Sequence, residues 1–436
     1  MPADASTPPG GRISLLPILA VNFVGTLGFS IVIPFLVFLV TDWGGNALVL
    51  GLMGATYSAF QLIGAPVLGR WSDRIGRRKV LMLSQLGTLA SWCVFLVAFF
   101  VPLTTVLDVD STTLGQFSLT LPLILAFFAR ALDGLTGGNV SVANAYLADI
   151  TDDDDRSANF GKMAVSGNLG FVIGPAIAGV LGATAYGNIV PVTATLLISV
   201  VALAIIVFRL QEYSPCQIEA APSPRSVRKV FGQEHRECYE IDDADIPFAE
   251  VLRLQHVMPL LLAYFLVTLG FSCFYIGFPV HAAGVLQWSV AQTGTFFAFM
   301  SLIMVLVQGP LLSRLSKLFS ETSLAVIGTA ILAAGFFAFL ADETAALYVG
   351  AAGIAVGNGL MWPSVMALLS KTGDRRTQGA IQGAGGSVGA VASIVGLVLG
   401  GVLYETFGAS VFILAALTVL PVGAIVALSF RGKESA

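Results

Sequence analysis

The sequence predicts an all-α integral membrane protein whose twelve transmembrane helices form two pseudo-symmetric bundles of six. The first reason is composition: 56% of the 436 residues are hydrophobic, 11% are charged, and the mean hydropathy is +0.86. Soluble domains carry about 25% charged residues, so these charges are too few to cover a water-soluble surface. The second reason is the recurrence of long apolar runs, and the third is the one-sided placement of Lys and Arg.

Twelve apolar segments are long enough to cross a membrane. About 20 apolar residues span the hydrocarbon core, which is about 30 Å thick, as a helix. The first segment is too long for the core of a signal peptide, so we expect it to be retained. The expected spans are residues 13–41, 47–70, 79–102, 121–147, 160–184, 190–209, 256–279, 290–312, 322–341, 346–370, 378–404 and 408–431.

Lys and Arg fall on one side of these spans. With a cytoplasmic N-terminus, the inside loops and helix ends hold all of the 22 basic residues except Arg130, which lies within helix 4. Cytoplasmic loops of membrane proteins carry such an excess. The sequence therefore predicts a multi-pass protein of the cell inner (cytoplasmic) membrane with both termini in the cytoplasm. The expected outside loops hold no basic residue, yet they carry the acids Asp108, Asp110, Asp342, Glu343 and Glu405.

A long polar stretch divides the chain into halves. We expect a tail at 1–12, a six-helix bundle at 13–210, a cytoplasmic linker at 211–255, a second bundle at 256–431 and a tail at 432–436. Cys216, His235 and Cys238 in the linker are too irregularly spaced to favour a metal site, so no metal is expected. The halves also repeat each other, because GRWSDRIGRRK at 69–79 corresponds to GPLLSRLSKLF at 309–319. Parallel repeats of this kind are typical of transporters.

The loop between helices 2 and 3 carries a GxxxDRxGRR motif. Its glycines permit a tight turn, and its carboxylate, placed just before helix 3, suits the positive end of that helix. A basic loop alone would fix the orientation in the membrane, so the additional carboxylate and glycines indicate a further role; the alternative is that the charges only fix the orientation. Its residues are Gly69, Asp73, Arg74, Gly76, Arg77 and Arg78.

Helix 4 carries two charges close to the expected bilayer midplane, Arg130 and Asp133. Each charge costs about 2.5–3.5 kcal/mol on insertion scales, and intramembrane charges are usually functional. Their i, i+3 spacing places them on one helix face, where they can neutralise each other. We predict a proton-coupling site; the alternative is a closed ion pair that only braces the bundle.

These motifs resemble the major facilitator superfamily over the whole chain. The loop motif is similar to that family's signature, and residues 127–161 resemble helix 4 and the following loop of its tetracycline-efflux branch of drug:proton antiporters. GNLGFVIGPAIAG at 167–179 looks like the motif of exporters in helix 5. Its GxxxG step lets another helix pack closely, and its proline can kink the helix. The residues that carry this motif are Gly170, Gly174, Pro175 and Gly179.

The resemblance implies a cavity lined by helices 1, 4, 7 and 10, and a latch that holds the halves together while the cavity faces outward. Members of the branch carry an acid in helix 1, whereas this chain has Asn22 in that helix and Gly25 at the matching position. Proton coupling would therefore rest on Asp133. The cavity candidates are mostly apolar or aromatic, which suits a lipophilic substrate: Asn22, Phe29, Tyr57, Gln61, Asn168, Tyr264, Tyr275, Asn358 and Trp362.

The sequence favours alternating-access, proton-coupled export of small lipophilic or amphipathic compounds. The alternative is a lipid or metabolite transporter without proton coupling, which the missing acid in helix 1 favours. A membrane enzyme is disfavoured because no nucleophile motif or phosphate loop faces the membrane. The expected partners are a small lipophilic substrate and the bilayer, without nucleic acid. A monomer without cofactor is expected, with the proton as coupling ion.

The first prediction concerns topology. Cysteines introduced at Pro222 and Thr112 should react with a membrane-impermeant maleimide from opposite sides of sealed vesicles, because one lies in the linker and the other in an outside loop. Labelling of both from the same side would contradict the twelve-helix topology.

Overall fold

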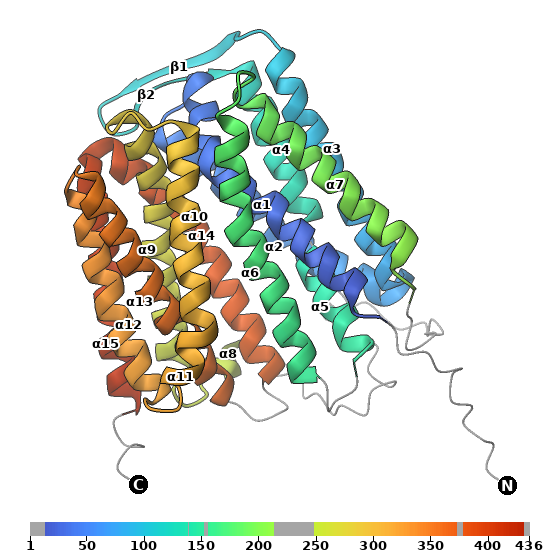
Figure 1. Cartoon of the computed structure of the whole chain (residues 1–436), viewed down its shortest axis with the longest axis vertical. Helices are drawn as coiled ribbons and strands as arrows, with labels where there is room; N and C mark the ends of the chain where they lie inside the picture. Colours follow the sequence, from blue (N-terminus) through green and yellow to red (C-terminus); the bar gives the residue numbers. More distant parts are fainter. Residues whose placement is uncertain (1–13, 138, 152–155, 213–247, 373–377, 431–436) are drawn as a thin grey trace, which may run out of the picture.

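The computed structural model describes residues 14–137, 139–151, 156–212, 248–372 and 378–430. Helices dominate it (Figure 1). The first half comprises α1 (Leu16–Asp42), α2 (Ala47–Ile75), α3 (Arg77–Val97), the turn η1 (Ala98–Phe100), β1 (Thr105–Ser111), β2 (Gly115–Thr120), α4 (Leu121–Thr136), α5 (Asn139–Asp149), α6 (Arg156–Gly182) and α7 (Ile189–Arg209).

The second half begins with the short helix α8 and contains a π-helical turn, η4. Its elements are α8 (Phe248–Val251), α9 (Val257–Gly284), α10 (Val290–Leu306), η4 (Val307–Leu311), α11 (Leu312–Leu315), α12 (Glu321–Phe337), η5 (Ala338–Leu340), α13 (Thr344–Lys371), α14 (Gln378–Phe407), η6 (Gly408–Ser410) and α15 (Val411–Phe430).

The described helices account for twelve crossings. Ten candidate spans are long and apolar enough to cross a membrane, or eleven if α1 counts as one span bent by 43° between Val32 and Pro34. One of the ten, Gly383–Phe430, is 48 residues long and contains both α14 and α15, which each pack along α9. It therefore supplies two crossings, and the predicted fold class is confirmed.

Three local features differ from the sequence-based expectations. The expected fourth helix is broken into α4 and α5 around Gly137, because glycine stabilises a helix interior poorly. An antiparallel hairpin, β1–β2, crosses the end of the bundle where an irregular loop was expected (Figure 1). Finally, α2 extends to Ile75, so Asp73 lies in its last turn and not in a loop.

Two helix pairs form the most extensive contacts between the halves, α2 with α14 and α6 with α10. Glycine lets their backbones touch: a Cβ on Gly51 would collide with the Leu397 carbonyl, and a Cβ on Gly294 would lie 2.5 Å from the Gly179 Cα. Both contacts lie toward the end of the bundle that carries β1–β2, hereafter the hairpin end. Among the described glycines, the close contacts between the halves all lie toward this end.

At the opposite end, the α2–α3 turn is fixed by arginines. Gly76 has φ +105°, a conformation that glycine adopts without strain. Arg77 follows it, and its Nε lies 2.8 Å from Asp149 Oδ2 on α5. Arg78 donates to the carbonyls of Ile206 and Val207 on α7, at 3.2 and 2.5 Å. The motif thus ties α3 to α5 and α7 within one half.

The second prediction concerns this turn. Arg77→Ala should lower the transport rate without preventing insertion, because it removes the ion pair to Asp149 while the turn at Gly76 remains. Initial transport rates in vesicles, normalised to the amount of inserted protein, provide the measurement. Lys79→Ala, a neighbouring exposed cation, is the matched control. Equal rates in the two variants would leave the motif with an orientation role only.

Candidate functional site

The intramembrane charges lie where α2 and α4 are in backbone contact. A Cβ on Gly64 would collide with the Leu135 carbonyl, and one on Gly134 would collide with the Tyr57 carbonyl. Small residues permit such close approach between transmembrane helices. As a result, the aromatic ring of Tyr57 is placed directly against the charged face of α4.

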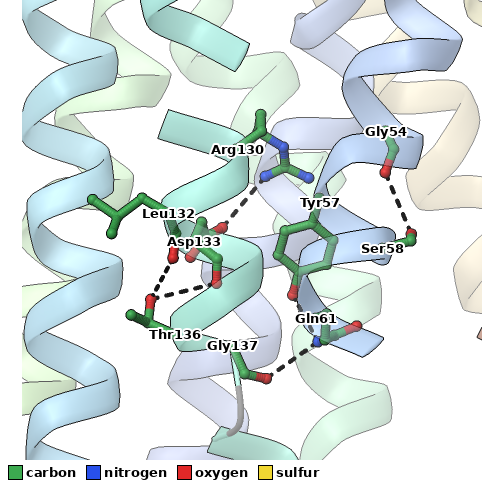
Figure 2. A network of polar contacts seen from close by, with 9 residues as sticks. All are labelled: Gly54, Tyr57, Ser58, Gln61, Arg130, Leu132, Asp133, Thr136 and Gly137. Carbon is green, nitrogen blue, oxygen red and sulfur yellow. Dashed lines mark hydrogen bonds and ion pairs between the residues drawn. The ribbon is translucent and has the colours of Figure 1, made fainter. Parts of the chain in front are cut away.

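Arg130 and Asp133 form a long ion pair inside this contact (Figure 2). Arg130 Nη1 lies 3.4 Å from Asp133 Oδ2, and the two residues are 6% and 8% exposed. The Arg130 guanidinium also lies over the Tyr57 ring, 4.4 Å from its centroid, an attractive arrangement for a cation. The Arg130 Nε has no hydrogen-bond partner. The guanidinium is therefore incompletely satisfied by the protein.

Asp133 is held from the other side by α3 and lies next to the break in the helix. The Thr88 side chain hydrogen-bonds to its carboxylate. Gln61 Nε2 donates to the Tyr57 hydroxyl at 3.0 Å and to the Gly137 carbonyl at 3.2 Å (Figure 2). Because α4 ends at Thr136, the Gly137 carbonyl is free for such a partner. The charged pair, the aromatic ring and the broken helix thus form one polar network.

Two cavities adjoin this network. The first lies within the first half and has a volume of about 280 Å³; we call it the N-half cavity. It is lined by residues of α1–α4, Gly137, α5, α6 and α7: Val21, Asn22, Val24, Gly25, Thr26, Gly28, Phe29, Tyr57, Gln61, Gln85, Thr88, Trp92, Asp133, Gly137, Ala143, Phe171, Ser199 and Ala202.

The second lies between the halves and has a volume of about 310 Å³; we call it the central cavity. Its walls are mostly apolar, with Ser58 and Ser393 facing it from α2 and α14. The residues that line it are Phe29, Val32, Leu36, Leu50, Gly54, Tyr57, Ser58, Gln61, Arg130, Tyr275, Ile276, Pro279, Ser393 and Leu397.

The ion pair spans the wall between the two cavities. Phe29, Tyr57 and Gln61 line both spaces, whereas Asp133 lines the N-half cavity and Arg130 lines the central cavity. A molecule in the central cavity can therefore reach the cation without touching the acid. Protonation of the acid, in turn, can be sensed on the other side of the wall through the guanidinium.

The remaining predicted cavity residues are distributed unevenly. Asn22 lines the N-half cavity, but its amide donates to Met163 O and Ser166 Oγ, both at 2.9 Å, and so holds α6. Asn168 Nδ2 lies 3.5 Å from Gln308 Oε1, which belongs to the other half. Of the predicted cavity residues in the second half, only Tyr275 lines one of these two cavities. Tyr264 packs against Trp362 with ring centroids 4.7 Å apart, and Asn358 Nδ2 lies 3.9 Å from Met304 Sδ.

The contribution of α3 to the N-half cavity was not predicted from the sequence. Gln85, Thr88 and Trp92 line the N-half cavity from one face of this helix. They recur at spacings of three and four residues, the period of one helix face. A search for polar stripes on transmembrane helices would have found them.

The glycines of α6 divide between two partners. A Cβ on Gly170 would lie 2.8 Å from Phe23 O, and one on Gly174 would collide with Ser30 Oγ, so both pack against α1. A Cβ on Gly179 would lie 3.1 Å from Ala291 O of α10 in the other half. Pro175 contributes its carbonyl to the same junction, 2.7 Å from a Cβ on Gly294. This segment therefore connects packing within one half to packing between the halves.

Several predictions concern residues outside the part of the chain that the structure describes. They are the linker residues Cys216, His235 and Cys238, the two tails and the side chain of Asp73, all outside the described residues. Arg74 is exposed, and a Cβ on Gly69 would meet no atom within 4 Å. Among the described residues, no group of three or more His, Cys, Asp or Glu is arranged to hold a metal.

The chain is similar in sequence and in structure to several known proteins. The chain is 26% identical to the tetracycline resistance protein, class C, of Escherichia coli over 388 residues, covering 88% of this chain and 87% of that protein. It is 24% identical to solute carrier family 22 member 18 of Mus musculus, covering 85% and 84%. The crystal structure of the human organic anion transporter MFSD10 (TETRAN) shares the fold with a TM-score of 0.67 at 22% identity, covering 96% of this chain and all of that one.

The family profile matches nearly all of the chain, in two stretches at residues 18–317 and 260–436. It agrees with the twelve-helix fold and with the resemblance carried by the motifs. This chain belongs to the Major Facilitator Superfamily, and it is a membrane secondary transporter and not an enzyme.

Proposed function

We propose that the chain exports small lipophilic or amphipathic compounds by alternating access, and that Asp133 couples export to protons. The observation that carries this proposal is the buried Arg130–Asp133 pair in the wall between two cavities. Several tetracycline resistance proteins are similar to this chain, which supports export of drug-like compounds. We place the protein in the inner membrane as a monomer, with both termini and the 211–255 linker in the cytoplasm and a bundle on each side of the linker.

Asp133 is the acid best placed to carry the proton. Among the described helices it is the only Asp or Glu near the middle of a membrane crossing, the thirteenth of 29 residues in Leu121–Asp149. At Gly25, where the resemblance implies an acid, a Cβ would meet no atom within 4 Å, so open space stands where that side chain would begin. Alternating access can change the environment of Asp133 by moving the Tyr57 and Gln61 wall. Such a change would bind and release a proton on opposite sides.

The substrate class follows from the lining of the central cavity. Most of its walls are aliphatic or aromatic, with two serines and the amide of Gln61 as neutral polar groups. Binding sites with few polar groups select mainly apolar ligands and orient them through those groups. A volume of about 310 Å³ fits a compound of drug-like or metabolite size.

The third prediction tests coupling in liposomes that contain purified protein. Asp133→Asn removes the titrating group and nearly preserves its shape, so accumulation of tetraphenylphosphonium driven by a pH gradient should be lost while downhill exchange persists. Glu321→Gln, which removes an acid paired with Lys371 outside both cavities, is the control and should accumulate normally. Normal accumulation by the Asn variant would exclude Asp133 as the proton carrier. If transport by the unaltered protein does not depend on the pH gradient, an uncoupled lipid or metabolite carrier is favoured.

A second candidate substrate is an organic anion, and the unpartnered Nε of Arg130 favours it. Arg130 is a buried cation that lines the central cavity, and guanidinium groups bind carboxylates through paired hydrogen bonds. The human neighbour of known structure is described as an organic anion transporter. An anion on Arg130 would compete with Asp133 for the guanidinium, and the displaced acid would then take up a proton.

The two candidates differ in the sign of their pH dependence. In the export proposal, the substrate and the proton exclude each other; in the anion alternative, they bind together. The charged or titratable groups lining the two cavities are Asp133, Arg130, Tyr57 and Tyr275. Tyrosine ordinarily titrates near pH 10, so Asp133 is the group whose protonation distinguishes the two candidates.

The fourth prediction uses purified protein and 1-naphthoate as the probe, between pH 6 and 8. If an anion binds with uptake of one proton, its affinity should rise as the pH falls, by up to about tenfold per pH unit. Arg130→Gln should remove this affinity, whereas the uncharged 1-naphthamide should bind both proteins equally. Affinity for naphthoate that is independent of pH and of Arg130 would exclude the anion candidate.

A further inference from the structure

The hairpin end holds a contact between the halves that no motif predicted. Glu405 lies two residues before the end of α14, and its Oε1 accepts a hydrogen bond from the Ala47 backbone N–H at 2.7 Å. Ala47 is the first residue of α2, in the other half. The carboxylate therefore reaches across the junction between the halves.

The chemistry of this contact is favourable. The first N–H groups of a helix have no partner within it, and the positive end of the helix dipole attracts a carboxylate. Asn46 satisfies one of these groups by accepting from Val49 N at 3.1 Å. Glu405 satisfies another from the opposite half. Separation of the halves at this end would return both the Ala47 N–H and the carboxylate to water.

The β1–β2 turn covers the contact. A Cβ on Gly115, which has φ +74°, would lie 2.5 Å from Glu405 Oε2. Asn46 Nδ2 donates to Leu114 O at 2.9 Å. Thr406 Oγ1 donates to Thr113 O at 3.3 Å, so the turn also contacts α14 directly. The hairpin thus belongs to one half and lies on the end of a helix from the other (Figure 1).

Packing shows that this end is closed. Below the Glu405 contact, a Cβ on Gly401 would lie 2.6 Å from Ala47 O, and Gly51 is in backbone contact with Leu397. Farther along the same two helices, a Cβ on Gly69 or Gly383 would meet no atom within 4 Å. The central cavity lies between these regions, lined by Ser58 and Ser393. The α2–α14 pair is therefore tightest where Glu405 binds.

We propose that Glu405 is the latch of the hairpin-end gate. Its carboxylate binds the start of α2 while the gate is closed, and the bond must break before the central cavity can open to that side. Glu405 acts on the equilibrium between the closed and open gate, without touching the substrate. The inference rests on membership in a family of alternating-access transporters, and it is independent of what is carried or whether protons drive it.

The test measures gate opening directly. Ser393→Cys places a reporter on the central cavity, in full-length protein whose four native cysteines are replaced by serine and which is reconstituted in sealed vesicles. Labelling by an impermeant maleimide from the hairpin side reports the open gate. Glu405→Ala should increase the labelling rate by about tenfold or more, the shift produced by losing a hydrogen bond to a charged group. Glu405→Gln, which retains an acceptor without the charge, should give an intermediate rate.

The matched control is Glu343→Gln, an exposed acid at the same end of the bundle that precedes α13. It should leave the labelling rate unchanged. Gly51→Ala should also increase labelling, because it forces α2 away from Leu397 without altering any charge. If the reporter in the Glu405→Ala variant is labelled at the same rate as in the unaltered protein and in the control, Glu405 is not the latch.

A second measurement does not depend on how well the Glu405 variants fold. Thr113→Cys and Thr406→Cys together place two thiols where the hairpin turn meets α14. Crosslinking them should stop transport of whichever probe the liposomes transport, and reduction should restore it. Full transport by the crosslinked protein would show that this end need not open. If transport does not depend on the pH gradient but Glu405→Ala still increases the labelling rate, the proposed proton coupling is wrong and the latch proposal stands.

Discussion

Arg130 and Asp133 are buried in the middle of a membrane-spanning bundle, where only 6% and 8% of their surfaces are exposed and few groups can replace a lost partner. Each charge costs about 2.5–3.5 kcal/mol to insert, and removing one partner of a buried pair leaves the other uncompensated. The 3.4 Å separation and the unpartnered Nε show that the pair is not fully closed. The guanidinium is also held by the Tyr57 ring. The surrounding structure must therefore keep α2 against α4, because any gap there would leave these charges exposed to an apolar environment.

The same use of glycine that holds this pair also joins the halves. Gly64 and Gly134 bring α2 and α4 into backbone contact within the first half, and Gly51 and Gly294 do so between the halves. Lipid tails are as apolar as leucine, so close van der Waals contact is a main source of attraction between membrane helices. Contacts that depend on a missing Cβ are short in range. They separate after a small displacement, which suits junctions that must close and open repeatedly.

The fold could be predicted almost completely, because membrane burial imposes long apolar runs and a one-sided distribution of basic residues. The helix 4 pair was also predictable, since a charge in an apolar run is conspicuous. Its surroundings were not: the contact with Tyr57 depends on the register of α2 against α4, which no single helix specifies. The hairpin left a readable signal, because Leu107 and Val109 alternate with Asp108 and Asp110 before a Gly115 turn. Because this segment lies between two apolar runs, it was expected to be an irregular loop.

The predictions of cavity-lining residues were more accurate in the first half of the chain than in the second. Phe29, Tyr57 and Gln61 all lie in the wall shared by the two cavities, whereas Tyr264 and Trp362 pack against each other. An aromatic residue on a pore-lining helix can face the cavity or the neighbouring helix, and only the rotation of that helix decides. Polar side chains are constrained further, because each one must also find a hydrogen-bond partner. Asn22 shows how this constraint misleads, since an amide that lines a cavity can use both its hydrogens to hold α6 in place.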